Sequence, residues 1–205
     1  MKIYLLESED WEKSVISREK VKALIEKYAN EAEELLDNPS AELNIIVKPS
    51  LPHISSTKGV GGSTYDAELI DITFDPLLPF GTKKFKKYLK EAIFHEMNHA
   101  LYMKFNPRED RQLYWTILEG LGIVFDTKYA DGEHFTQGRA TEEDKLAWFY
   151  KFNSNSVSHW DTPNDGMMYD TGAWLVMRAE KNSGKNVVEL TKLSCDEILR
   201  LSNTK

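Results

Sequence analysis

The chain has 205 residues, of which 41% are apolar and 29% charged, so it can bury a core, and its composition excludes an intrinsically disordered protein. The net charge of −7 and the pI of about 5.3 argue against nucleic acid as a partner, because the average field repels a polyanion. A lone cysteine, Cys195, excludes an internal disulfide. We predict a single domain over residues 1–205.

The chain starts without the features of a secretory signal. Residues 1–7 reach Glu7 before any long apolar run, and no stretch approaches the roughly 20 apolar residues of a membrane span. We therefore expect a cytoplasmic protein with no membrane partner. The sequence carries no signal of its oligomeric state.

The first part of the chain is predicted to hold the strands. Residues 3–6 and 43–48 are short apolar runs typical of strands, and between them residues 17–37 repeat apolar side chains at helical spacing. Residues 59–64 are rich in glycine but lack the lysine and spacing of a phosphate-binding loop, which favours a loop or an irregular edge strand. Residues 69–74 alternate apolar and polar, which predicts a half-buried strand.

The rest of the chain is predicted to be mainly helical. We expect helices over 83–105, 110–129, 141–152 and 167–182, and a short last helix that begins at a capping box formed by Ser194 and Glu197. Gly184 is a plausible stop for the helix before it. This order of elements predicts an α+β fold in which a small, mainly antiparallel sheet packs on a helical body.

The helix predicted over 83–105 contains the run H-E-M-N-H at residues 95–99. Residues four apart lie one turn apart on the same face of a helix, so His95 and His99 can reach a single zinc ion. Glu96 is adjacent and can act as the general base for a water bound to that metal. This H-E-x-x-H arrangement predicts a catalytic zinc site.

A catalytic zinc site has three protein ligands, so one more is expected outside this run. Glu119 is the best candidate, because it lies in an apolar helical stretch where an unpaired carboxylate is costly to bury. His134 and His159 are rival ligands, and Asp126 is better suited to hydrogen-bond a ligating histidine. The glycines within residues 120–122 are expected to let this helix pack close to the metal helix.

Three features together resemble the gluzincin metallopeptidases: the H-E-x-x-H motif, a glutamate twenty residues after its last histidine, and an alternating strand ahead of the metal helix. The sequence also resembles the YjaZ-like family of predicted zinc-dependent proteases in Glu-Gly-Leu-Gly at 119–122 and in Tyr-x-x-Gly at 169–172. The glycines of residues 59–62 look like that family's edge segment. The resemblance covers roughly residues 55–200 and implies a zincin-like fold, bound zinc and peptide hydrolysis.

The sequence departs from the gluzincin pattern at one position. Many gluzincins place an aspartate four residues after the third ligand, where it braces a ligating histidine, and this chain has Ile123 there. No motif fixes the group that stabilises the oxyanion of the reaction. Tyr169 and His159 are the candidates, because a phenol or an imidazole can donate a hydrogen bond to it.

The predicted function is hydrolysis of peptide bonds in a peptide or protein substrate, through a zinc-bound water that Glu96 activates. Residues 69–74 are a candidate edge on which an extended peptide could lie. Two alternatives stay open: a zinc-binding protein with a regulatory or scaffolding role and no turnover, and a metallohydrolase that acts on a substrate other than a peptide. A structural zinc site would normally have a fourth ligand, often cysteine, and Cys195 stands alone far along the chain.

Overall fold

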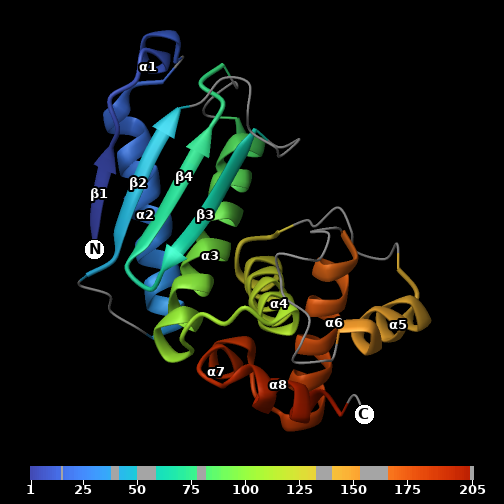
Figure 1. The fold of residues 1–205 in the computed structure, drawn as a ribbon. Coiled ribbons are helices and arrows are strands. Elements are labelled where there is room, and N and C mark those ends of the chain that lie inside the picture. Colours follow the sequence, from blue (N-terminus) through green and yellow to red (C-terminus); the bar gives the residue numbers. More distant parts are fainter. Residues whose placement is uncertain are drawn as a thin grey trace.

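The computed structural model of the protein describes residues 1–14, 16–37, 42–49, 59–77, 82–132, 140–152 and 166–203. They form a mixed α+β structure in which a small sheet lies beside a larger group of helices (Figure 1). The strands are β1 (Lys2–Leu5), β2 (Asn44–Pro49), β3 (Val60–Asp66) and β4 (Leu69–Phe74). The helices are α1 (Asp10–Lys13), α2 (Arg18–Leu36), α3 (Lys83–Phe105), α4 (Gln112–Tyr129), α5 (Glu142–Phe152), α6 (Gly166–Ser183), α7 (Val187–Thr191) and α8 (Cys195–Ser202).

The four strands lie in the order β1-β2-β4-β3. β1 pairs with β2 and β2 pairs with β4 in parallel, whereas β3 pairs with β4 antiparallel. The prediction of a mainly antiparallel sheet is therefore wrong. The reason is α2, which forms a crossover between β1 and β2 and returns the chain in the same direction.

The edge strand of the sheet next to α3 is β3, not β4. β4 lies between β2 and β3, so the prediction that residues 69–74 form an exposed edge is wrong. β3 has β4 as its one strand neighbour among the described residues, and its register shifts between Thr64 and Asp66. The interpretation of residues 59–64 as an irregular edge strand is confirmed for the residues that belong to β3.

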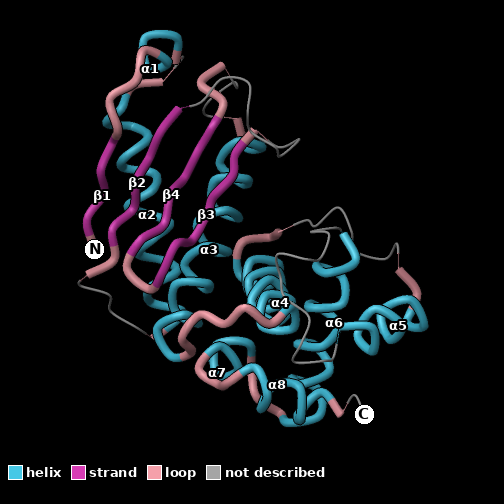
Figure 2. The backbone as a smooth tube through the Cα atoms, viewed as in Figure 1, coloured by secondary structure: helices cyan, strands magenta, loops and turns pink. Residues whose placement is uncertain are grey.

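Two long helices, α2 and α3, run behind the sheet (Figures 1 and 2). Alternate residues of a strand point to one face, and on this face the apolar side chains of β2 and β4 are fully buried. These side chains are Ile45, Val47, Ile70, Ile72 and Phe74. Their burial fixes α3 against the sheet, and α3 carries the candidate metal ligands.

Local signals set most helix ends as predicted. The side chain of Ser17 accepts a hydrogen bond from the backbone of Lys20 at the start of α2, and the capping box of Ser194 and Glu197 is present at the start of α8. Gly184 ends α6 with a φ of 73°, where a side chain would be strained. None of the described helices is both long enough and apolar enough to cross a membrane.

α4 packs against α3 on one side and against α6 on the other. The backbones of α4 and α6 are in direct contact. A Cβ added to Gly120 would lie 2.2 Å from the carbonyl carbon of Gly172, and a Cβ added to Gly172 would lie 2.1 Å from the carbonyl oxygen of Thr116. Neither position has room for a side chain, so the two glycines set the distance between these helices.

Replacement of Gly172 by alanine is expected to destabilise the protein by about 3 kcal/mol, because the added methyl group meets rigid backbone that must move apart. Urea unfolding followed by circular dichroism measures this change. Lys181→Ala, at an exposed position of the same helix, serves as the control and should change stability by no more than about 0.5 kcal/mol. Equal effects of the two substitutions would contradict the close contact of α4 and α6.

Candidate metal centre

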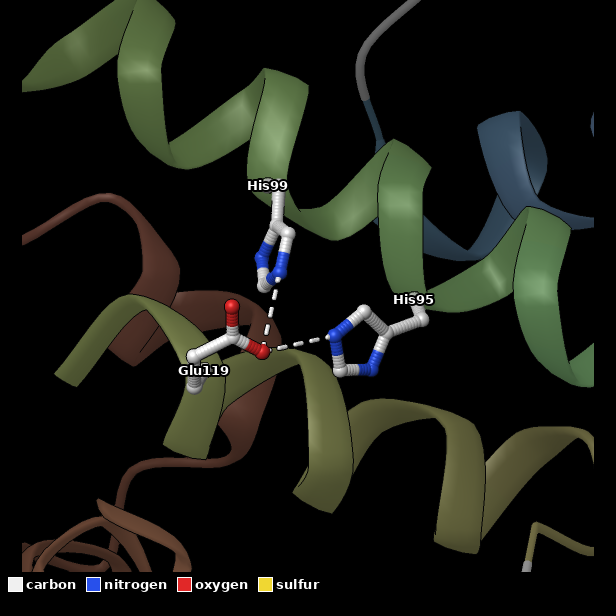
Figure 3. A group of neighbouring side chains, drawn as sticks. All are labelled: His95, His99 and Glu119. Atoms are coloured by element: carbon white, nitrogen blue, oxygen red, sulfur yellow. Dashed lines mark hydrogen bonds and ion pairs between the residues drawn. The ribbon is translucent and has the colours of Figure 1, made fainter. Parts of the chain in front are cut away.

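The two histidines of the H-E-x-x-H run lie on one face of α3 and point towards α4, as Figure 3 shows. Their ring centroids are 4.3 Å apart. His99 is buried with 4% of its surface exposed, and His95 is partly buried. Glu119 reaches towards both imidazoles from α4. The structure therefore brings together the three ligands predicted from the sequence.

The three side chains converge on a small space. Nε2 of His95 lies 3.1 Å from Oε2 of Glu119, and Nε2 of His99 lies 3.5 Å from the same oxygen. Neighbouring ligand atoms in a tetrahedral zinc site with bonds of about 2.1 Å lie about 3.4 Å apart. The two distances fit that value. Among the described residues, this is the group of histidines and carboxylates whose ligand atoms approach closely enough to hold a metal ion.

Gly122 makes this approach of the two helices possible. A Cβ at this position would lie 2.7 Å from Cε1 of His95 and 2.8 Å from Cε1 of His99. Real Cβ atoms do not approach other atoms so closely, and the rings could not keep their positions beside any larger residue. The expectation that glycines bring the two helices together is thus confirmed for Gly122, whereas Gly120 serves the contact with α6.

Asp126 braces the first histidine from behind. Its Oδ2 lies 3.0 Å from Nδ1 of His95, so an N–H at Nδ1 donates to the carboxylate and leaves Nε2 free to face Glu119. The prediction that Asp126 hydrogen-bonds a histidine is confirmed. This aspartate lies seven residues after Glu119 instead of four, yet seven residues are almost two full turns of helix and return to the same face.

A tight turn holds Asp126 in place. A Cβ added to Gly132 would lie 2.3 Å from Oδ1 of Asp126, and the backbone N–H of Gly132 donates to the Asp126 carbonyl over 3.1 Å. Asp131 has a φ of 53°, in the left-handed region. By contrast, Nδ1 of His99 is buried and finds no hydrogen-bond partner among the described residues. The two candidate ligands are therefore held unequally.

The charged groups of the cluster stabilise one another's ionised forms. Burial alone lowers the pKa of His95, but its hydrogen bonds to Asp126 and Glu119 and their charges outweigh burial and raise this pKa well above its usual value. Burial alone raises the pKa of Glu119, but the charge of His99 and hydrogen bonds from both histidines bring it far below its usual value. When no metal is bound, a proton on His95 thus stabilises the cluster. A metal ion that binds there must displace that proton.

Glu96 lies on the neighbouring face of α3 and is held by the sheet. Its side chain is buried, and its Oε2 lies 2.7 Å from the hydroxyl of Thr64 on β3, which also lies 3.0 Å from the Glu96 carbonyl. Gly62 leaves room for it, since a Cβ there would lie 2.5 Å from Cγ of Glu96. Burial raises the pKa of Glu96 above its usual value, although the charges of both histidines and the Thr64 hydroxyl oppose this rise.

Sequence reasoning missed the roles of Thr64 and Gly62. The glycines within residues 59–62 indicated an edge strand, but they did not indicate that this strand contacts Glu96. Tyr169 lies on α6 in a half-buried position against the core and is not one of the three clustered residues. His134 and His159 lie outside the described residues. The predicted roles of these three residues stay predictions.

The purified protein is expected to contain about one zinc per chain, and His95→Ala and Glu119→Ala should each lose most of it, because two remaining ligands bind zinc weakly. Elemental mass spectrometry after dialysis against zinc measures the content. Glu68→Ala, at an exposed position next to β4, is the matched control and should keep full zinc content. Unchanged zinc in the two ligand variants would show that the metal binds elsewhere.

Comparison with known proteins gave no match: no family model, no curated protein and no solved structure matches the chain. The likeness to the YjaZ-like family therefore depends on the residues quoted for it in the sequence.

Proposed function

We propose that the protein is a zinc-dependent metallopeptidase with His95, His99 and Glu119 as ligands and Glu96 as general base. The observation that carries this proposal is the convergence of two imidazoles and one carboxylate beside a buried glutamate with a raised pKa. A divalent zinc ion bound by these ligands would supply a Lewis acid, which lowers the pKa of a water towards about 7 and polarises a carbonyl group.

The donor set favours a catalytic site over a structural one. Structural zinc sites are usually closed by four protein ligands, often with cysteine, whereas catalytic sites have three and keep one position for water. The described residues supply three ligands, and Cys195 is a buried residue of α8 outside this cluster. A general base next to the ligands has no use in a purely structural site.

Glu96 is suited to move the proton. A base works best when its pKa lies near the working pH, and burial shifts this carboxyl upward from its ordinary value. Glu96 would accept the proton of the attacking water and deliver it to the leaving amine. The Thr64 hydroxyl holds one carboxylate oxygen, and the other would accept the proton.

The edge strand β3 supports a peptide as the substrate. At Gly62 and Thr64 this strand contacts Glu96. β4 pairs with one edge of the strand. An extended peptide that adds to β3 on the edge away from β4, where the described residues supply no further strand, would pass the proposed base, and backbone hydrogen bonds would hold it regardless of sequence. This combination of an edge strand and a metal helix also supports the zincin-like fold and the YjaZ-like resemblance. The candidate oxyanion donors remain Tyr169 and His159.

Glu96→Gln is expected to keep its zinc and lose at least about a hundredfold in turnover, because the amide cannot accept a proton. The measurement is cleavage of fluorescently quenched casein and of a peptide library, with zinc content determined on the same samples. Glu91→Gln, a buried glutamate of the same helix outside the cluster, is the control and should cleave like the wild type.

Other outcomes of this measurement separate the alternatives. Full activity of Glu96→Gln would refute the assigned base. Zinc binding without cleavage of any peptide would identify a zinc-binding protein without turnover, and hydrolysis of activated esters alone would identify a metallohydrolase with a substrate other than peptides.

Thr64→Val should lower turnover about tenfold, since the valine keeps the shape of threonine but cannot hold the Glu96 carboxylate by a hydrogen bond. Thr64→Ser restores the hydroxyl and should recover most of the rate. Zinc content should stay constant in both variants, because Thr64 contacts Glu96 and not a ligand. A serine variant as slow as the valine variant would assign the loss to altered packing of β3.

A further inference from the structure

A concave site lies between α4, α5 and α6. It is a cavity of about 360 Å³, within the range of pockets that hold small molecules. Most of its wall is apolar and comes from Ile123 and Val124 of α4 and from Ala173 and Met177 of α6. Met177 is 52% exposed, which makes it the outer part of this wall. Ile123 follows Glu119 by about one helical turn, so the cavity adjoins the ligand face of α4, but none of its lining residues belongs to the metal cluster.

One buried carboxylate faces this cavity. Asp170 of α6 lines the cavity and has 7% of its surface exposed. No hydrogen bond or ion pair from the described residues reaches it. The small exposed part of Asp170 faces the cavity, and a carboxylate among apolar side chains is stabilised when a group of opposite charge binds beside it. Asp170 therefore marks the point where the cavity would hold a cation.

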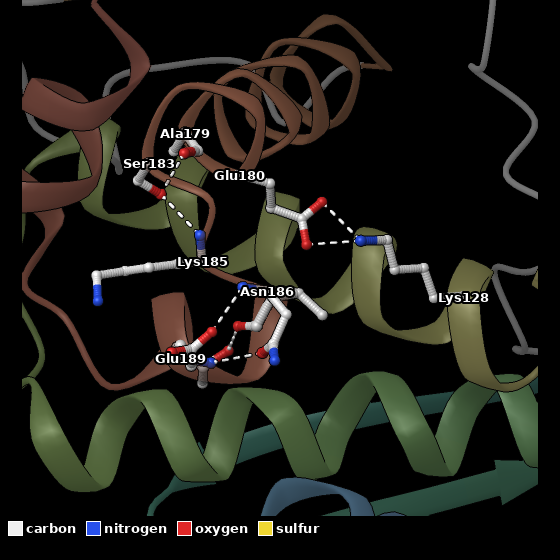
Figure 4. A network of polar contacts seen from close by, with 9 residues as sticks. Lys128, Ala179, Glu180, Ser183, Lys185, Asn186 and Glu189 are labelled. Carbon is white, nitrogen blue, oxygen red and sulfur yellow. Dashed lines mark hydrogen bonds and ion pairs between the residues drawn. The ribbon is translucent and has the colours of Figure 1, made fainter.

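Neither of the two lysines that line the cavity pairs with Asp170. The ammonium group of Lys128 is turned to Glu180, whose two carboxylate oxygens lie 2.6 and 2.7 Å away (Figure 4). Lys145 of α5 also lines the cavity but makes no ion pair with Asp170. A metal ion needs several ligand groups, and among the described residues the group that meets this need is the one at His95.

We infer that this cavity binds a small organic amine, with its ammonium group on Asp170 and its apolar body against Ile123, Val124, Ala173 and Met177. The apolar wall excludes a small hydrated cation, and the carboxylate disfavours an anion. The flexible side chain of Met177 can adapt to different apolar bodies. This inference is independent of the proposed peptidase activity, because it involves none of the residues assigned to the metal centre.

The test is a titration of the full-length protein with 2-phenylethylamine, followed by amide chemical shifts in two-dimensional NMR. Its neutral and anionic counterparts, 2-phenylethanol and 3-phenylpropanoate, are titrated in parallel. The amine should shift signals of residues 123–128 and 170–177 and bind at least about tenfold more tightly than the alcohol, because a charge-assisted hydrogen bond is lost in the alcohol. The anion should bind more weakly than either.

Variants locate the binding group. Asp170→Asn should weaken binding of the amine at least about tenfold and leave binding of the alcohol unchanged. Lys145→Met should bind the amine as tightly as the wild type or more tightly. Equal affinity of amine and alcohol for the wild type would overturn the inference, and this comparison needs no variant to fold. Shifts confined to the residues around His95 would overturn it as well.

Discussion

The candidate centre depends on how closely α4 can approach the helices on either side of it. On the side of α3, Gly122 lets the backbone of α4 lie against the rings of His95 and His99. On the side of α6, Gly120 and Gly172 meet backbone to backbone. A side chain at Gly122 would hold α4 too far from α3 for Glu119 to reach both imidazoles. The close packing of α4 therefore also sets how near Glu119 lies to the two imidazoles.

The second requirement is the balance of charge in a buried place. Glu119 and Asp126 put two carboxylates against His95, and buried carboxylates are tolerated when positive charge lies beside them. Their effect is visible in the raised pKa of His95 and the lowered pKa of Glu119. The same negative charge would also favour the dication that we propose for this place.

Much of the centre could be predicted from the sequence because its signals are local. The spacing of His95 and His99 fixes their common face, and the apolar stretch around Glu119 marks a buried carboxylate that needs a partner. The contact of Thr64 with Glu96 spans 32 residues and follows no periodicity, so no pattern reveals it. The direction of the strands likewise depends on where α2 returns the chain. The sequence did not predict α7, because its five residues are too few to show a helical repeat. Asn186 and Glu189 nevertheless form a capping box at its start.

Among the described residues, those of the metal cluster and those that hold Glu96 and His95 come from one continuous part of the chain, residues 62–132. The hydrogen bonds of the site join residues 24, 31 and 32 positions apart, and they lie between β3 and the turn after α4. The entropy cost of closing loops of this size grows slowly with their length, by about 0.6 kcal/mol for each doubling. α6 joins the structure from further along the chain, through its contact with α4. Its glycine contact thus supports α4 from outside the segment of the chain that supplies the site.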